Sequence, residues 1–198
     1  MIKKFSTLDN DFDSELDSLI AWDSSIDEKI SNSVKKIIDD VRHIGDRSVL
    51  DYTQKFDSIM AKSISELTIS KESLKQSFDN LKNEQKDALL IAAERIKSYH
   101  QNQVQESWNY SEDDGTVLGQ KITPLERAGL YVPGGKAAYP SSVLMNSIPA
   151  KVAGVEELIM VVPTPKGIVN ELVMAAAYVA EVDLVTVSYT HLTLPTIA

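Results

Sequence analysis

Apolar residues recur at helical spacing along the first half of the chain. Residues three and four apart lie on one face of a helix. Between Ser25 and Gly45 such positions form one stripe, made up of Ile26, Ile30, Val34, Ile37, Ile38 and Val41. Ser25 followed by Glu28 three residues later is typical of a helix start, and Gly45 is typical of a helix end. The pattern therefore predicts one amphipathic helix that ends at Gly45.

The same spacing predicts three more helices before residue 106. The first spans about 46–56, the second contains Leu74, and the third and strongest spans about 84–105. The core face of the third helix is expected to consist of Leu89, Ala92, Ala93, Ile96 and Tyr99. Residues 66–69 are typical of a short strand. The simplest interpretation of this half is a helical scaffold whose charged residues cover the solvent side.

After Trp108 the pattern changes to an alternation of apolar and polar residues. Residues 115–124 read as a strand that follows an Asp113-Asp114-Gly115 turn. Glycine and proline change at the same place, because residues 1–114 contain no proline and a single glycine, whereas seven glycines and all seven prolines follow. These two residue types mark turns and helix ends. We therefore expect long helices first and short elements with tight turns afterwards.

Strands and helices alternate along the rest of the chain. Short apolar runs at 127–132, 158–162 and 182–185 are typical of strands, and residues 142–155 and 168–179 are typical of helices. A continuous apolar run indicates a strand that is covered on both faces. The order strand, helix, strand, helix, strand is that of right-handed parallel crossovers. The predicted fold class is therefore α/β, with a helical region before a parallel sheet.

Composition and charge exclude several classes of function. Lys and Arg number 20 against 29 Asp and Glu, so the net charge of −9 argues against nucleic acid and against an anionic membrane surface as partners. The absence of cysteine excludes disulfides, thiolate chemistry and cysteine-ligated zinc. His43, His100 and His191 lie far apart in the sequence, so we expect none of them to bind a metal. With no signal peptide and no apolar run long enough to span a bilayer, a cytoplasmic protein is expected.

The most informative segment is the strand-to-turn junction that ends at Gly135. A strand leads into a Pro-Gly-Gly turn and a polar loop before the next helix. In a parallel sheet, ligands bind where strand ends meet helix starts. Gly134 and Gly135 permit the close backbone approach that a Cβ would prevent. Tyr131, at the strand end, is placed to lay its ring against a nucleotide.

The start of the following helix adds a second feature. Ser141 and Ser142 are placed to cap it, and free N–H groups at a helix start suit a phosphate. The segment matches neither the Gly-x-Gly-x-x-Gly fingerprint nor a P-loop. An ordinary strand-to-helix turn is therefore the competing interpretation.

Five segments carry a family resemblance. They are Gly-Leu-Tyr-Val-Pro-Gly-Gly at 129–135, Tyr-Pro-Ser-Ser-Val-Leu-Met at 139–145, Pro-Ala-Lys-Val-Ala-Gly-Val at 149–155, Val-Arg-His-Ile-Gly-Asp at 41–46, and Asp-Tyr-Thr-Gln-Lys-Phe-Asp at 51–57. Together they resemble the histidinol dehydrogenase family, and the similarity covers roughly residues 20–185.

This resemblance implies a zinc- and NAD-dependent enzyme of histidine biosynthesis. Such enzymes are homodimers that oxidise L-histidinol to L-histidine in two hydride transfers, each to a separate NAD. The resemblance also implies that residues 1–125 form an N-terminal helical region with short strands, and that residues 126–186 begin an incomplete Rossmann-like NAD-binding domain. Tyr131 matches the family's NAD-contacting tyrosine, and Gly134 and Gly135 match the adjacent turn.

The catalytic motifs of that family have no counterpart in this sequence. Its zinc ligands, its Glu-His acid/base pair and its substrate-binding residues belong to motifs that follow the segments matched here. We therefore assign no catalytic residue and no metal ligand, and we expect this chain to be inactive. One alternative is a non-catalytic nucleotide-binding or protein-interaction module on the same fold. Another is a helical scaffold in which the Pro-Gly-Gly segment is only a turn.

Residues 187–198 depart from the family pattern. In the family, the strand near 182–185 leads into a Gly-Gly-Ala-Gln-Ala run. Here Val187-Ser-Tyr-Thr-His-Leu192 follows, which the transposon-end sequence of sequencing adapters encodes. We expect this tail to be adapter-derived, with a divergent natural C-terminus as the alternative. Glu181 is a second departure, because the family usually has glycine there. We also expect an uncovered sheet edge after the third strand and marginal stability.

Overall fold

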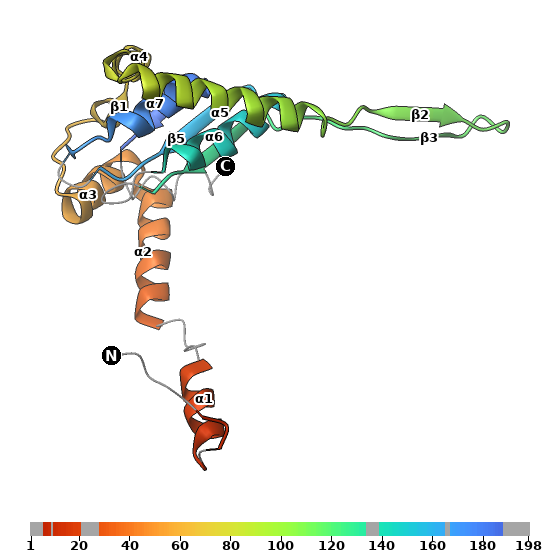
Figure 1. Cartoon of the computed structure of the whole chain (residues 1–198). Coiled ribbons are helices and arrows are strands. Elements are labelled where there is room, and N and C mark those ends of the chain that lie inside the picture. Colours follow the sequence, from red (N-terminus) through yellow and green to blue (C-terminus); the bar gives the residue numbers. More distant parts are fainter. Residues whose placement is uncertain (1–5, 9, 21–27, 134–138, 165–166, 188–198) are drawn as a thin grey trace. The chain divides into compact units, whose positions relative to one another are not determined.

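The computed structural model describes residues 6–8, 10–20, 28–133, 139–164 and 167–187 (Figure 1). The chain divides into two compact units, residues 1–39 and 40–198. The first unit contains α1 (Phe12–Ile20) and the larger part of α2 (Glu28–Ile44). The second unit contains all the remaining elements. Within the described residues, no helix combines the length and apolar character needed to cross a membrane.

The helices at the start of the second unit follow the predicted boundaries closely. Helix α2 ends at Ile44, as predicted, and a single residue separates it from α3 (Asp46–Asp57). Between them Gly45 has a φ of 72°, which glycine adopts without the steric penalty of a side chain. The predicted strand at 66–69 is shorter than expected: a 3₁₀ turn, η1 (Ile64–Leu67), precedes a two-residue strand, β1 (Thr68–Ile69).

Two further helices follow β1. Ser70 caps α4 (Lys71–Asn80) by accepting a hydrogen bond from the N–H of Ser73 at 3.1 Å. Helix α5 (Asn83–Gln101) ends four residues before the predicted boundary. The prediction that Tyr99 belongs to its core face is wrong, because that side chain is 64% exposed. At this end of α5, Lys97 and Gln101 turn toward α6, so Tyr99 points elsewhere.

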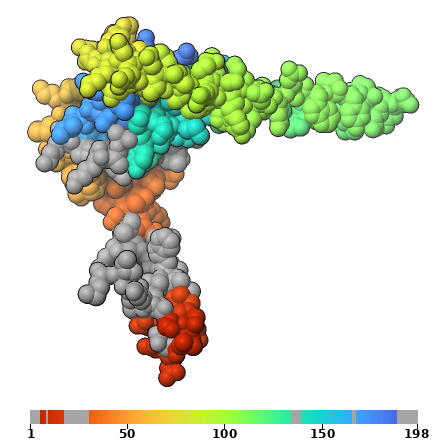
Figure 2. Space-filling view, viewed as in Figure 1, coloured from red at the N-terminus to blue at the C-terminus, as the bar shows by residue number. Residues whose placement is uncertain are grey.

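An antiparallel hairpin follows α5. Strands β2 (Trp108–Ser111) and β3 (Val117–Gln120) pair with Trp108 opposite Gln120. Gly115 forms the predicted turn with a φ of 88°. Every residue of both strands is exposed, and Figure 2 shows the green surface of this hairpin continuing from the end of α5.

The predicted parallel sheet is present, which confirms the α/β fold class. Its strands are β4 (Arg127–Tyr131), β5 (Glu157–Val161) and β6 (Leu184–Thr186), connected by α6 (Pro140–Val152) and α7 (Glu171–Val179). Both strand pairs are parallel, with Tyr131 opposite Val161 and Val161 opposite Thr186.

One edge of this sheet differs from the expectation. We expected the third parallel strand to have an uncovered edge, but β1 pairs with β6 in the antiparallel direction, so that Thr68 lies opposite Thr186. The strand order is β1-β6-β5-β4, and β4 is therefore the other outer strand of the described sheet.

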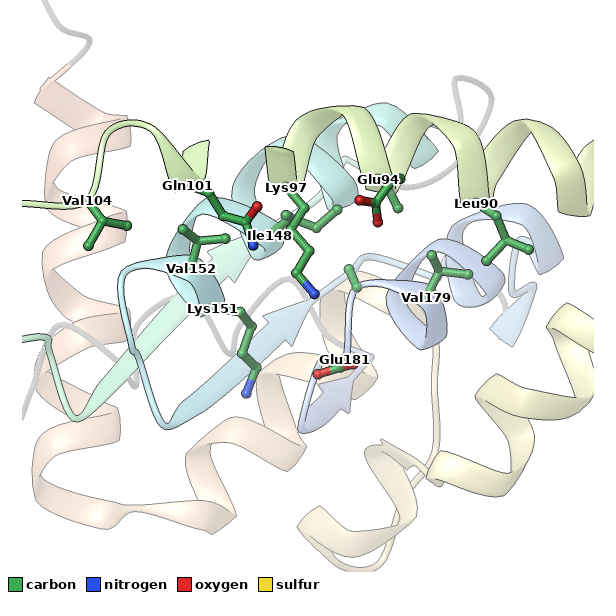
Figure 3. Close-up of a pocket in the computed structure, with 12 residues that line it drawn as sticks. Leu90, Glu94, Lys97, Gln101, Val104, Ile148, Lys151, Val152, Val179 and Glu181 are labelled. Atoms are coloured by element: carbon green, nitrogen blue, oxygen red, sulfur yellow. The ribbon is translucent and has the colours of Figure 1, made fainter. Parts of the chain in front are cut away.

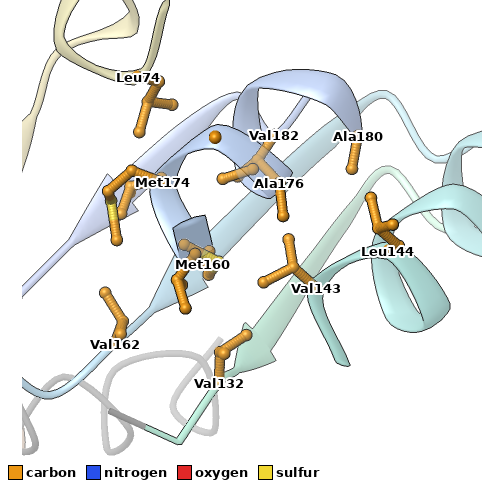
Figure 4. Close-up of a cluster of buried hydrophobic side chains, with 14 of the residues drawn as sticks. Leu74, Val132, Val143, Leu144, Met160, Val162, Met174, Ala176, Ala180 and Val182 are labelled. Atoms are coloured by element: carbon orange, nitrogen blue, oxygen red, sulfur yellow. The ribbon is translucent and has the colours of Figure 1, made fainter. Parts of the chain in front are cut away.

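The core lies between the sheet and the helices that cover it. Met160 of β5 and Val185 of β6 are fully buried, in a cluster that also contains side chains of α4, α5, α6 and α7. Figure 4 shows Met160 beside Val143 and Ala176, which come from α6 and α7. The run of alanines in α7 lets neighbouring elements approach closely, and interiors are packed to crystal-like density.

Candidate functional site

Tyr131 occupies the carboxyl end of β4. It is half-buried, and the next residue, Val132, is completely buried and donates its N–H to the carbonyl oxygen of Val161 at 3.0 Å. The strand end is therefore held in the sheet up to the point where the turn begins. Gly134 and Gly135 lie outside the described residues, so their predicted role remains a prediction.

The helix after this turn begins earlier than predicted. Tyr139 is its N-cap residue and Pro140 is its first helical residue, a position where the fixed φ of proline favours helix. Ser141 and Ser142 consequently lie inside the first turn, so the prediction that they cap the helix is wrong. No side chain caps this end, and its first turn contains no acidic residue.

The start of α7 is different, although it also follows a strand of the same sheet. Asn170 caps it by accepting a hydrogen bond from the N–H of Val173 at 3.1 Å, and Glu171 adds a negative charge to the first turn. A negative side chain satisfies the positive end of the helix dipole. Of the two helix starts, that of α6, next to Tyr131, is therefore the one suited to an anionic group.

A buried hydroxyl group lies at the same edge of the sheet. Thr164 follows the carboxyl end of β5 and is only 2% exposed. Its carbonyl oxygen accepts a hydrogen bond from the N–H of Gly167 at 2.8 Å, but its side-chain Oγ1 has no partner. Ser147 of α6 is the other described residue with a buried and unpaired hydroxyl. Such groups are rare in folded proteins, where most buried polar atoms are paired.

A cavity of about 510 Å³ lies at the opposite end of the helices, among α5, α6 and α7. Figure 3 shows Lys97 and Glu94 of α5 over this cavity, with Lys151 and Glu181 on its other side. Lys151 Nζ is held by Asp183 Oδ2 at 2.6 Å. Helix carboxyl ends are negative, so the ends of α6 and α7 do not favour phosphate here.

A second cavity, of about 600 Å³, is lined by β1, α4 and the start of α7. Glu171 is its sole charged lining residue, so it offers no cation to an anionic ligand. Neither of these two cavities is lined by Tyr131 or Thr164.

The two histidines in the described part of the chain, His43 and His100, belong to no cluster of metal-ligating side chains. In the described part of the chain, no three His, Asp or Glu side chains gather closely enough to hold a metal ion. The Nδ1 atom of His100 lies 2.6 Å from Gln103 Oε1, and His43 belongs to α2. His191 lies outside the described residues. A catalytic zinc needs three protein ligands, so the described residues do not fit one.

Comparisons with known proteins agree with the segments singled out above. The family model described as histidinol dehydrogenase matches residues 22–188, a range that contains β4, its carboxyl-end tyrosine and α6. The chain belongs to the histidinol dehydrogenase family. Histidinol dehydrogenases from Nitrosospira multiformis and Pseudomonas aeruginosa are 55% and 53% identical to it over 184 residues. Each alignment covers 93% of this chain and 42% of the relative, so the chain spans less than half the length of these relatives.

A solved structure of a family member has the same fold. The crystal structure of histidinol dehydrogenase from Elizabethkingia anophelis superposes with a TM-score of 0.72 at 25% identity. The superposition covers 80% of this chain and 36% of that one.

Sequence reasoning missed one residue of potential functional importance in this family member. Thr164 stands between Pro163 and Pro165, directly after a strand predicted to be buried. The sequence pattern places Thr164 after the predicted strand at 158–162. The lack of a hydrogen-bond partner for its hydroxyl depends on surrounding atoms that only the folded chain brings together.

Proposed function

We propose that this chain supplies part of the NAD-binding region of a histidinol dehydrogenase. The observation that carries the proposal is the family match across β4, with Tyr131 at the strand end beside a helix start that lacks a side-chain cap. The complete protein would oxidise L-histidinol to L-histidine with two NAD molecules, as the family name and the sequence resemblance suggest.

Each residue has a definite role in this proposal. Tyr131 packs its ring against the cofactor, and the N–H of Ser141 binds the pyrophosphate. Pro140 has no N–H, and the N–H of Ser142 already donates to the carbonyl oxygen of Tyr139 at 3.1 Å. Gly134 and Gly135 allow the backbone to approach it. NAD, when bound, supplies the hydride acceptor. The chain's own residues bind and orient the cofactor but do not move protons.

Catalysis would require groups that the sequence does not provide. The zinc ligands and the Glu-His pair of the family have no counterpart in the matched segments, so the isolated chain is expected not to oxidise histidinol. A homodimer and a cytoplasmic location remain predictions. The 187–198 tail also remains a prediction, and all but Val187 of it lies outside the described residues.

Isothermal titration calorimetry with NAD tests the proposal. The 198-residue chain should bind NAD, and Tyr131→Ala should weaken binding by about tenfold, the effect of losing one aromatic contact of roughly 1.4 kcal/mol. Tyr99→Ala is the control, because that exposed tyrosine of α5 should leave binding unchanged. If the wild-type chain is folded by circular dichroism and binds no NAD, the proposal is wrong for this chain.

The alternative of a non-catalytic module gives a different result. After the source DNA has been sequenced across codon 186, a genuine stop codon after Ala198 together with NAD binding would favour a small nucleotide-binding protein. A reading frame that continues into the family's zinc and Glu-His motifs would instead favour the dehydrogenase.

A further inference from the structure

Thr164 combines burial with an unsatisfied hydroxyl at an edge of the sheet. The side chain is 2% exposed, and Oγ1 has no hydrogen-bond partner. Burying a hydroxyl without a partner destabilises the folded state, because its hydrogen bonds to water are lost and no hydrogen bond within the protein replaces them. A packed interior normally avoids this arrangement by placing valine, which has the same shape, at such a position.

The hydroxyl lies at the edge that carries the candidate site. The N–H of Val162 donates to the carbonyl oxygen of Thr186 at 3.1 Å, so the chain remains in the sheet until two residues before Thr164. Figure 4 shows Val132 and Val162 together at the arrowhead ends of β4 and β5. Thr164 therefore leaves the sheet beside the strand end that Tyr131 occupies.

Strand order indicates which part of a dinucleotide would be near. In doubly wound sheets, the turn after the first strand binds the pyrophosphate, and a polar side chain at the end of the second strand binds the adenosine ribose. Here β4 is the first strand of the parallel series and β5 is the second, its direct neighbour. Thr164 follows β5 and so occupies the ribose position, where no acidic residue stands.

We propose that Thr164 is a cofactor-binding residue whose hydroxyl hydrogen-bonds the 2′-hydroxyl of the adenosine ribose. This inference rests on the proposed function, because it assumes that NAD binds at the carboxyl edge. This hydrogen bond would give the buried Thr164 hydroxyl a partner, and among the described residues at this edge no other buried hydroxyl lacks one. It also gives the site a means of recognising the ribose that does not need a carboxylate.

Binding of NAD and of its adenosine 2′-deoxy analogue to four forms of the chain tests the proposal. The wild-type chain should bind NAD about tenfold more tightly than the deoxy analogue, since a site built around a hydroxyl rejects a ligand that lacks it. Thr164→Val, which keeps the shape and removes the hydroxyl, should bind both ligands equally weakly. Thr164→Ser should restore the preference for NAD.

Ser147→Ala is the matched control. It removes the other buried, unpaired hydroxyl, which lies within α6 rather than at the sheet edge. This variant should keep the full preference of the wild-type chain for NAD, and thermal unfolding should show all four forms folded.

The outcomes separate this inference from the function on which it rests. If the wild-type chain binds NAD but does not distinguish the deoxy analogue, the ribose contact is wrong while the proposed function stands. The same holds if Thr164→Val keeps the preference, because Thr164 is then only a packing residue. Should the folded wild-type chain bind neither ligand, the proposed function fails and the role of Thr164 fails with it.

Discussion

Lys151 of α6 and Asp183, just before β6, form an ion pair with 2.6 Å between Nζ and Oδ2. The N–H of Leu158 also donates to Asp183 Oδ2 at 2.9 Å. Lys71 Nζ lies 3.4 Å from the other carboxylate oxygen. One carboxylate thus joins α4, α6 and the amino ends of two parallel strands.

This arrangement predicts a dependence of stability on pH. Burial by itself raises the pKa of Asp183, but the hydrogen bonds from Lys151 and Leu158 outweigh it, and the pKa falls below its usual 3.8. A carboxylate with a lowered pKa stabilises the folded state above its unfolded pKa, and that contribution disappears as the pH falls through the folded value. Unfolding in urea from pH 7 to pH 3 should therefore show a loss of stability at the acidic end.

Asp183→Asn tests the assignment. At pH 7 it should reduce the free energy of unfolding by about 1–3 kcal/mol, the usual loss for hydrogen bonds to a charged group. Near pH 3 the difference from the wild-type chain should shrink. Asp87→Asn, at an exposed position of α5, is the control and should follow the wild-type profile. A variant with a constant deficit from pH 7 to pH 3 would contradict the assignment.

Replacing Glu181 by glycine should stabilise the protein. Glu181 follows the C-cap residue of α7 and has a φ of 55°, and the N–H of Val182 donates to the carbonyl oxygen of Ala177. Left-handed backbone is unfavourable for residues with a Cβ, so Glu181→Gly should stabilise the fold by about 1 kcal/mol. Glu181→Ala removes the same charge but keeps the Cβ, and its thermal midpoint should not rise. Equal effects of the two substitutions would indicate a charge effect instead.

A side chain at position 119 should disrupt the β2–β3 hairpin. A Cβ at this position would overlap the carbonyl oxygen of Trp108 and lie 2.8 Å from Asn109 Cβ. Gly119→Ala should therefore separate β2 from β3 and abolish the stacking of Trp108 on Tyr110, whose ring centroids are 6.3 Å apart. The Trp108 indole signal in two-dimensional NMR should shift toward its random-coil position. Val117→Ala, the control on the same strand, should leave that signal in place.

Two methionines test where the core lies. Met160 is completely buried in β5, so Met160→Ala should cost about 2–5 kcal/mol of stability through lost packing and a residual cavity. Met60 is 82% exposed, and Met60→Ala should change the free energy of unfolding by less than about 0.5 kcal/mol. Urea denaturation of both variants measures the difference. Similar losses at the two positions would mean that this core is incorrectly placed.

Local signals in the sequence were sufficient for most elements. The end of α2 follows from Gly45, and the parallel strands follow from continuous apolar runs flanked by turn residues. Proline at position 140 is itself a start signal because its fixed φ suits the first helical residue, but the two serines that follow it are typical N-cap residues as well. Helix α5 ends four residues before the predicted boundary, and the N–H of its C-cap residue Asn102 donates to the carbonyl oxygen of Tyr99.

Contacts between distant segments were not predictable in the same way. The pairing of β1 with β6 has no local signature, since a two-residue strand carries almost no periodicity. At the candidate site, the strand-end position of Tyr131 follows from the sequence. The unpaired state of the Thr164 hydroxyl does not, because it depends on every atom around it.

The pairing of Thr68 with Thr186 has a consequence for synthesis of the protein. During translation, β1 leaves the ribosome long before β6. It cannot pair with β6 until the residues between the two strands have been synthesised. Contacts between such distant positions slow folding, because a long loop has to close before they form. During that interval the nascent chain exposes the sides of α4 and α5 that later pack on α7 and α6, and a chaperone that recognises apolar helix faces would bind there.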